Sequence, residues 1–251
     1  MKAKKIFLSL LAIFSIMISC EDEEFLDRKP NQLSDEYYYS TPEGLEQGIN
    51  AAYDILQLGE SLGRIEFVGI VCSGDALAGG EPGGNDQQPL QFTMKFQINP
   101  TNAYCRTYWN TLYIGIYRCN LLIYYLNKSD GIVSEEDKNR LLGEAYFLRA
   151  LFHFKLQNLF GGVPQLQASF TEKLKGIPYN DHVLTPEEWE PVRPELEYTW
   201  GKIEEDFKTA SDLLQPRSAV YTNPNFVGKA TKGAALAMLA KTYLYQEKWQ
   251  L

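Results

Sequence analysis

The stretch GEAYFLRALFHFKLQNLFGGVP, residues 143–164, decides the fold class of this 251-residue chain. Together with the residue two before it, its apolar side chains recur every three or four positions, on one face of an α-helix: Leu141, Ala145, Leu148, Phe152, Leu156 and Leu159. Ser134, followed by three acidic residues, predicts the N-terminal cap. Gly161-Gly162 and Pro164 predict the end of the helix.

The same spacing predicts further helices along the chain. One begins at Thr41-Pro42, a favourable cap and first residue, and the last begins at about Lys229. Their inward-facing positions are Leu45, Ile49, Ala52 and Leu56; Trp109, Leu112, Ile116, Cys119, Ile123 and Leu126; Leu196, Trp200, Ile203, Phe207, Ala210 and Leu214; and Leu236, Leu239 and Tyr243. No series of alternating strands is present, so the sequence predicts a mainly α, all-α fold.

Two segments lack this periodicity. Residues 59–97 are rich in glycine and proline and are predicted to form a long irregular loop, in which residues 65–72 could form a short strand or helix. Between Leu166 and Pro194 the pattern is also irregular, and only Thr185-Pro186-Glu187-Glu188 predicts a short capped turn.

Two helices carry the Leu, small residue, Tyr spacing of a tetratricopeptide repeat. It is present in Leu142-Gly143 with Tyr146, and in Leu239-Ala240 with Tyr243. We therefore expect tetratricopeptide-like helical hairpins, which need stacked neighbours to bury their apolar faces. The chain stops at Leu251, where the partner helix of the last hairpin is expected, so we expect the C-terminal part of the protein to be missing.

The N-terminus predicts export. Three lysines and then an apolar run over residues 6–19 form a secretory signal peptide, residues 1–19, which is too short to span a membrane. Met17-Ile18-Ser19-Cys20 resembles a bacterial lipobox, with Met in place of the usual Leu, which predicts lipidation of Cys20. The alternative is an ordinary secreted protein. Acidic residues 21–24 resemble the surface-export signal of Bacteroidota-type lipoproteins, and residues 20–40 are then a lipidated tether.

Composition excludes several classes of function. The formal net charge of −8 argues against nucleic acid as a partner. Two histidines cannot form a three-histidine metal site, and the four cysteines form no C-x-x-C pair, so we expect no metal and no cofactor. The sequence contains none of the common hydrolase, nucleotide-binding or metalloprotease motifs, so we expect no catalytic residue.

Several residues with chemical potential are better explained by packing. Trp109, Tyr113, Tyr117 and Tyr124 have helical spacing and are predicted to lie in the core or between helices, although a sugar platform is the alternative. His153 is predicted to be a hydrogen-bonded structural histidine. Cys72, Cys105 and Cys119 are predicted to be buried free thiols, and the last two are too far apart on one helix to bridge each other.

Four segments together resemble the SusD/RagB family of surface lipoproteins. They are residues 20–27 (CEDEEFLD), 109–120 (WNTLYIGIYRCN), 143–164 and 230–245 (ATKGAALAMLAKTYLY). Only Gly162 departs from the third segment, where the family commonly has a polar residue. The resemblance implies a SusD-like α-helical domain over residues 41–251, corresponding to the N-terminal half of a typical member.

The resemblance also implies a function. Such a protein is held in the outer membrane by its lipid anchor and works with a SusC-like TonB-dependent transporter. It captures an oligosaccharide, or a peptide in RagB-like members, and breaks no bond. Several members carry binding residues in the segment that is glycine-rich here, so the candidate ligand-binding residues are Asp75, Asn85, Asp86, Gln87, Gln88 and Phe92.

Other interpretations remain open at this point. The acidic loop residues could suggest calcium, but they lack the spacing of a calcium-binding loop, and a solvated turn is the simpler interpretation. A glycoside hydrolase could draw two carboxylates from 32 acidic residues, although nothing in the sequence selects a pair. A surface-anchored repeat scaffold for protein partners is the third possibility.

Overall fold

The computed structural model describes residues 34–59, 63–80, 87–128, 131–220 and 222–250. The structure divides into two parts, residues 1–37 and residues 38–251, and the second part contains nearly all the described helices. The predicted signal peptide and Cys20 lie outside the described residues. The predicted all-α fold is confirmed: in the described ranges the only β pairing is a single antiparallel bridge between Lys175 and Glu195.

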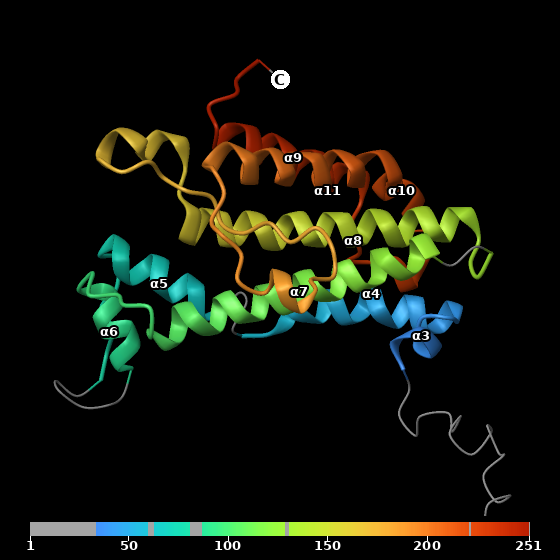
Figure 1. The fold of residues 1–251 in the computed structure, drawn as a ribbon, viewed down its shortest axis with the longest axis horizontal. Helices are drawn as coiled ribbons and strands as arrows, with labels where there is room; N and C mark the ends of the chain where they lie inside the picture. The colour runs from blue at the N-terminus through green and yellow to red at the C-terminus, as the bar shows by residue number, and fades with distance from the viewer. Residues whose placement is uncertain (1–33, 60–62, 81–86, 129–130, 221, 251) are drawn as a thin grey trace, which may run out of the picture. The chain divides into compact units, whose positions relative to one another are not determined.

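The chain is built from a series of helices with short 3₁₀ and π turns between them (Figure 1). The helices are α3 (Asp35–Tyr38), α4 (Pro42–Gln57), α5 (Gly63–Ser73), α6 (Gln88–Met94), α7 (Ala103–Lys128), α8 (Glu135–Leu156), α9 (Leu196–Leu213), α10 (Arg217–Val220) and α11 (Lys232–Leu244). A π turn, Gln157–Gly161, extends α8, and 3₁₀ turns lie at Pro164–Ser169, Pro186–Glu188 and Pro224–Phe226.

The helices that begin at predicted caps do so because a side chain satisfies a free backbone N–H. Thr41 accepts from the N–H of Gly44, and Ser134 from that of Asp137. The last helix, predicted to begin at about Lys229, is capped by Thr231, which accepts from the N–H of Ala234 and was not predicted as a cap. Thr185 and Glu188 form the predicted capping box at the short turn between α8 and α9. The starts of α4, α8 and this turn were therefore predictable from local chemistry.

The long helices pack as hairpins. Helix α8 lies between α7 and α9, α11 packs against α9, and α4 packs against α7 (Figure 1). Close approach is allowed by glycine: a Cβ at Gly115 would lie 2.6 Å from the ring of Phe152, and one at Gly143 would lie 2.8 Å from Leu214 Cγ. The core between the helices includes the fully buried side chains of Trp200, Phe152, Phe207, Leu112, Ile116 and Leu148.

The predicted long loop over residues 59–97 is wrong in part. Helix α5 contains residues 65–72, for which a helix was one of the two predicted alternatives, whereas α6 was not predicted. Their side chains Val68, Val71 and Leu90 form a second, smaller core. Tyr104 of α7 and Met94 pack against it. Burial of these apolar residues stabilises helices whose local pattern is weak.

Some predicted inward-facing side chains are exposed. Tyr117 and Tyr124 are each 48% exposed, so their assignment to the core is wrong, whereas Trp109 and Tyr113 do pack against the core. The helical period was correct, but these two tyrosines lie on a face of α7 that is open to solvent. Leu159 and Leu236 are also more than one third exposed.

Cys72, Cys105 and Cys119 are all free thiols. Cys119 is fully buried, and burial raises its pKa to about 12, which makes it an inert core residue. Cys72 and Cys105 are half-buried, so the prediction of burial is wrong for these two. Cys105 and Cys119 share α7, as predicted. Among the described helices, none is both long and apolar enough to cross a membrane.

Candidate functional site

The predicted ligand-binding residues fall on or next to α6. Asn85 and Asp86 lie outside the described residues. Gln87 precedes α6 in a left-handed conformation (φ 52°) and accepts a hydrogen bond from the Tyr104 hydroxyl at 2.7 Å. Gln88 begins α6 and is exposed, and Phe92 on the same helix is 38% exposed. These three side chains are therefore carried by one short segment that is anchored to α7.

Asp75 lies at the end of α5 rather than on α6. It accepts a hydrogen bond from the Ser73 hydroxyl at 2.8 Å and is exposed. The segment after Asp75 is held to α6 by a hydrogen bond, which Gln91 Nε2 donates to the Gly79 carbonyl at 3.1 Å. Asp75 is thus on the same small lobe as Gln87 and Phe92, and its described polar contacts are local to the turn.

A groove of about 450 Å³ lies beside this lobe, at the N-terminal end of α7. Trp109 and Phe160 form its aromatic wall, with their rings edge to face and centroids 5.0 Å apart. The remaining lining residues are Ile98, Asn99, Pro100, Cys105 and Arg106. A groove with aromatic rings, one amide and one guanidinium can hold an apolar ring face and bind its polar edges.

This groove was missed in the sequence. Trp109 was assigned to packing, and it does pack against the core, but part of its ring also faces the groove. Phe160 follows α8 and is far from Trp109 in the chain, so no local pattern could bring the two together. The Tyr104 hydroxyl, which binds Gln87, belongs to the residue before Cys105 of the groove. The predicted and the missed residues therefore lie on adjoining segments.

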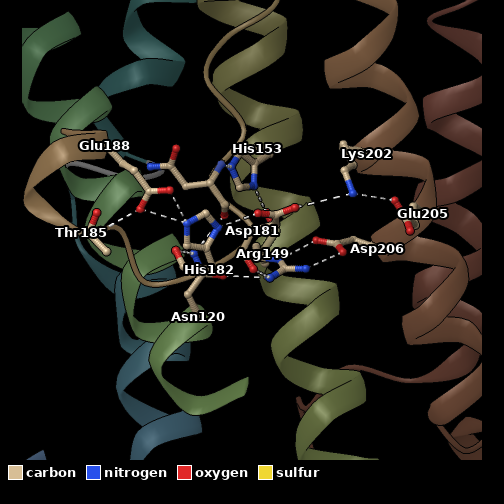
Figure 2. Close-up of polar contacts among 11 residues, drawn as sticks. Asn120, Arg149, His153, Asp181, His182, Thr185, Glu188, Lys202, Glu205 and Asp206 are labelled. Atoms are coloured by element: carbon tan, nitrogen blue, oxygen red, sulfur yellow. Dashed lines mark hydrogen bonds and ion pairs between the residues drawn. The ribbon is translucent and has the colours of Figure 1, made fainter. Parts of the chain in front are cut away.

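A buried polar cluster fixes the scaffold behind these surfaces (Figure 2). Arg149 of α8 forms a bidentate ion pair with Asp206 of α9, with both N–O distances 2.7 Å. The Arg149 Nη1 donates to Asn120 Oδ1 of α7 at 2.8 Å and to the Asp181 carbonyl at 2.7 Å. Burial alone lowers the pKa of Arg149, but the charge of Asp206 raises it above its ordinary value, so the guanidinium is charged.

His153 belongs to the same cluster and is structural, as predicted. Its Nδ1 faces the Arg149 carbonyl at 2.9 Å, and its Nε2 accepts from the Asn180 N–H at 3.2 Å. This pair of contacts requires a neutral ring with its proton on Nδ1. Burial, together with the charge of Arg149, lowers the pKa of His153 to about 3. Tyr179 stacks on the ring, with centroids 3.8 Å apart, and donates its hydroxyl hydrogen bond to Asp206.

The second histidine, His182, lies in the loop between α8 and α9 and contacts two carboxylates of that loop. His182 is exposed and lies between Asp181, at 2.9 Å, and Glu188, at 3.0 Å (Figure 2). Hydrogen bonds to these two carboxylates raise the pKa of His182 above its ordinary value of 6.5. Asn120 Nδ2 donates to the carbonyls of Asn180 and His182, which holds the loop along α7.

Neither cluster has the arrangement of a catalytic or metal centre. The polar atoms of Arg149 and Asp206 are engaged by one another and by protein groups, and both side chains are less than one tenth exposed. Within the described ranges, His, Cys, Asp and Glu side chains form no group of three that could hold a metal ion.

Comparison with known proteins gives a consistent result. Residues 24–244 match a SusD-like family described as starch-binding and associating with the outer membrane. SusD-like protein P25 of Formosa agariphila is 27% identical over 261 aligned positions, which cover 100% of this chain and 44% of that protein. A SusD-like protein of Bacteroides ovatus is 26% identical over 256 positions, which cover 99% of this chain and 40% of that protein.

Solved structures share the fold. A laminarin-binding SusD-like protein aligns with a TM-score of 0.63 and 26% identity over 83% of this chain and 41% of its own length. Surface glycan-binding protein A from Bacteroides fluxus aligns with a TM-score of 0.65 and 24% identity over 83% of this chain and 41% of its own length. The chain thus spans less than half the length of these relatives.

We predict that Asp206→Ala lowers the free energy of unfolding by roughly 3–5 kcal/mol, because it leaves the buried Arg149 charge without its counterion. Glu205→Ala, one residue away, removes the exposed ion pair with Lys202 and should cost less than about 1 kcal/mol. Urea denaturation of both variants measures the difference. Equal losses would show that the buried pair contributes no more than the surface pair.

The two histidines should contribute to stability with opposite pH dependence. The pKa of His182 is raised in the folded protein, so this residue stabilises the folded state below pH 6.5, and the contribution is lost as the pH rises through its folded pKa. The pKa of His153 is lowered, so its contribution is lost as the pH falls from 6.5 toward about 3. Glu188→Gln should lower the pKa of His182 in an NMR titration. Glu187→Gln is the matched control, and an equal shift in both variants would contradict the contact.

Proposed function

Because the chain belongs to the SusD-like family, we propose that it is a surface-exposed lipoprotein that binds a glycan without cleaving it and delivers it to a SusC-like TonB-dependent transporter. Family membership rests on the match over residues 24–244. The laminarin-binding relative, at 26% identity, supports an oligosaccharide as the ligand. Since the chain covers less than half of these relatives, ligand and partner are proposed for the whole protein rather than assigned to this part alone.

The observation that carries the glycan proposal is the aromatic groove beside α6. Sugar rings present a flat apolar face and a polar edge of hydroxyl groups, and the Trp109 and Phe160 rings offer a surface for the face. Asn99 and Arg106 at the groove can pair with the hydroxyls. We place Gln87, Gln88, Phe92 and Asp75, on the adjoining lobe, as further contacts for a longer chain of sugars, with Asn85 and Asp86 in the same segment of sequence.

The location proposed for the protein rests on its N-terminus. The sequence of a signal peptide, a lipobox cysteine and four acidic residues favours export and attachment to the outer membrane through a lipid on Cys20. The family description, associating with outer membrane, agrees with this location. A protein with these features would hold its binding groove outside the cell, where polysaccharide fragments arrive.

Trp109→Ala should weaken glycan binding by about tenfold, because it removes one ring of the groove. Tyr117→Ala is the matched control: it removes an exposed aromatic ring from the same helix, outside the groove, and should leave the affinity unchanged. Calorimetry with soluble laminarin, a panel of other polysaccharides and a peptide mixture measures both variants against the wild type.

The outcomes of that experiment separate the alternatives. Saturable glycan binding with no release of reducing ends supports the proposal. Binding of peptides alone would identify a RagB-like protein, and cleavage of the glycan would identify an enzyme. Equal loss in the Trp109 and Tyr117 variants, or no loss in either, would remove the groove as the site.

Cys20→Ala should release the protein from the outer membrane, because no acyl chain can then be attached. Cys105→Ala is the control, since it also removes a thiol but leaves the lipobox intact. Cell fractionation measures the location, and mild-detergent purification of the wild type should retain a TonB-dependent transporter. Membrane attachment of the Cys20→Ala variant would contradict the proposed lipid anchor. Purification of the wild type without a transporter would contradict the proposed partner.

A further inference from the structure

The aromatic groove beside α6 offers a ligand hydrogen-bond donors rather than acceptors. Asn99 Oδ1 already accepts from the Thr101 N–H at 3.0 Å and from the Thr101 hydroxyl at 2.7 Å. Because a backbone N–H can only donate, these contacts fix the orientation of the amide and leave its Nδ2, a donor, for a ligand. The Arg106 guanidinium and the Trp109 indole N–H belong to two other lining residues and are donors only.

Two backbone carbonyls at the groove are engaged as well. The Asn99 carbonyl accepts from the Asn102 N–H at 3.0 Å, and the Phe160 carbonyl accepts from Arg193 Nη2 at 2.9 Å. Burial raises the pKa of the Cys105 thiol, so this lining group is protonated and carries no charge. A ligand that is rich in acceptors therefore matches the groove best.

The charge of the groove is positive. Arg106 lines it and is exposed, and none of the lining residues is an acid. Within the described ranges, the Arg106 side chain forms no ion pair or hydrogen bond. Arg193, which holds the Phe160 carbonyl, carries a second positive charge, and its guanidinium donates to three backbone carbonyls rather than to a carboxylate. The chain as a whole has a formal net charge of −8, so the groove is opposite in sign to the rest of the molecule.

The stability of α7 does not explain the position of Arg106. This residue is the fourth of the helix, where the helix dipole disfavours a cation. An exposed guanidinium that has no counterion in the described chain contributes little to the folded state. Its charge and its donors are therefore available to a ligand.

An acidic sugar combines the features that this groove matches. Its ring has an apolar face, which fits the rings of Trp109 and Phe160, whose centroids lie 5.0 Å apart. Its carboxylate or sulfate group brings several acceptors and a negative charge, which a guanidinium binds through charge-assisted hydrogen bonds. A neutral sugar instead brings hydroxyls that each have a hydrogen to donate, whereas the groove supplies mainly donors.

We propose that the groove selects an acidic glycan, in which Arg106 pairs with a carboxylate or sulfate group of the sugar whose ring lies on Trp109 and Phe160. This inference rests on the glycan-binding function proposed above and narrows the class of its ligand. Asp75, on the adjoining lobe, does not line the groove and so places no negative charge in it.

Calorimetry on the purified protein tests the class of ligand. The probes are oligogalacturonate and a sulfated galactan oligosaccharide, each with its uncharged counterpart, the methyl ester and the desulfated chain. At least one acidic probe should bind about tenfold more tightly than its counterpart, and the one that does so distinguishes a carboxylate from a sulfate ester. Raising the salt concentration from about 0.05 M to about 0.5 M should weaken that binding several-fold, because salt screens exposed charges.

Variants of Arg106 test the residue. Arg106→Gln should weaken binding of the acidic probe by about tenfold and leave its uncharged counterpart unaffected, whereas Arg106→Lys keeps the charge and should retain most of the affinity. Arg217→Gln is the matched control: it removes the same charge from an exposed residue of α10, outside the groove, and should leave the affinity unchanged.

The outcomes separate this inference from the proposed function. Glycan binding with no preference for the acidic probes, equal in Arg106→Gln and the wild type, would overturn the inference and leave the glycan-binding function intact. The absence of binding to any acidic or neutral glycan would overturn both. Equal weakening in Arg106→Gln and Arg217→Gln would show general attraction to a cation and would overturn the assignment to the groove.

Discussion

The ion pair between Arg149 and Asp206 is the interaction on which the rest of the structure depends. It joins α8 to α9, and through Asn120 and the Asp181 carbonyl it also joins α7 and the loop after α8. Removing charges from water is costly, and this cost is offset only because every polar group of the guanidinium has a partner. The pair therefore requires one relative placement of three helices, which nonspecific apolar packing alone would not require.

The fixed placement of α7, α8 and α9 also determines which residues meet at the two ends of these helices. Because the loop at residues 177–182 is held by Asn120, His153 and Arg149, α7 and α8 keep a fixed register along their length. Trp109 near the start of α7 and Phe160 just after α8 then meet to form one wall of the groove, and the start of α8 meets the end of α9 at a cavity of about 740 Å³. A rigid helical frame with variable connections is the usual way to place binding residues on a surface.

Features of this fold that depend on residues close together in the sequence could be predicted, and those that depend on distant residues could not. The starts of α4 and α8 were predictable because a cap and its helix lie within a few residues, and the all-α class followed from a repeated 3.6-residue period. Helix α6 was missed, and α5 was predicted only as one of two alternatives, because their stability comes from a small core shared with Tyr104 of α7. Likewise, nothing local to Trp109 signals Phe160, and Tyr117 differs from Tyr113 only in which side of α7 is covered.

Two charged networks hold α8 to its neighbours, one around Arg149 and one around Arg140. Arg149 and Arg140 lie nine residues apart in sequence, and each pairs with buried carboxylates. At Arg149 the Nε, Nη1 and Nη2 atoms all donate to described groups, so the network is closed and leaves no atom for a ligand. At Arg140 the Nε donor has no hydrogen-bond partner in the described chain, and Glu144 Oε2 lies 3.7 Å from Lys229 Nζ. Since unpaired buried polar atoms destabilise a fold, a closed network is expected where only stability matters. Because its hydrogen bonding is less complete, the Arg140 network should stabilise the fold less than the Arg149 network does.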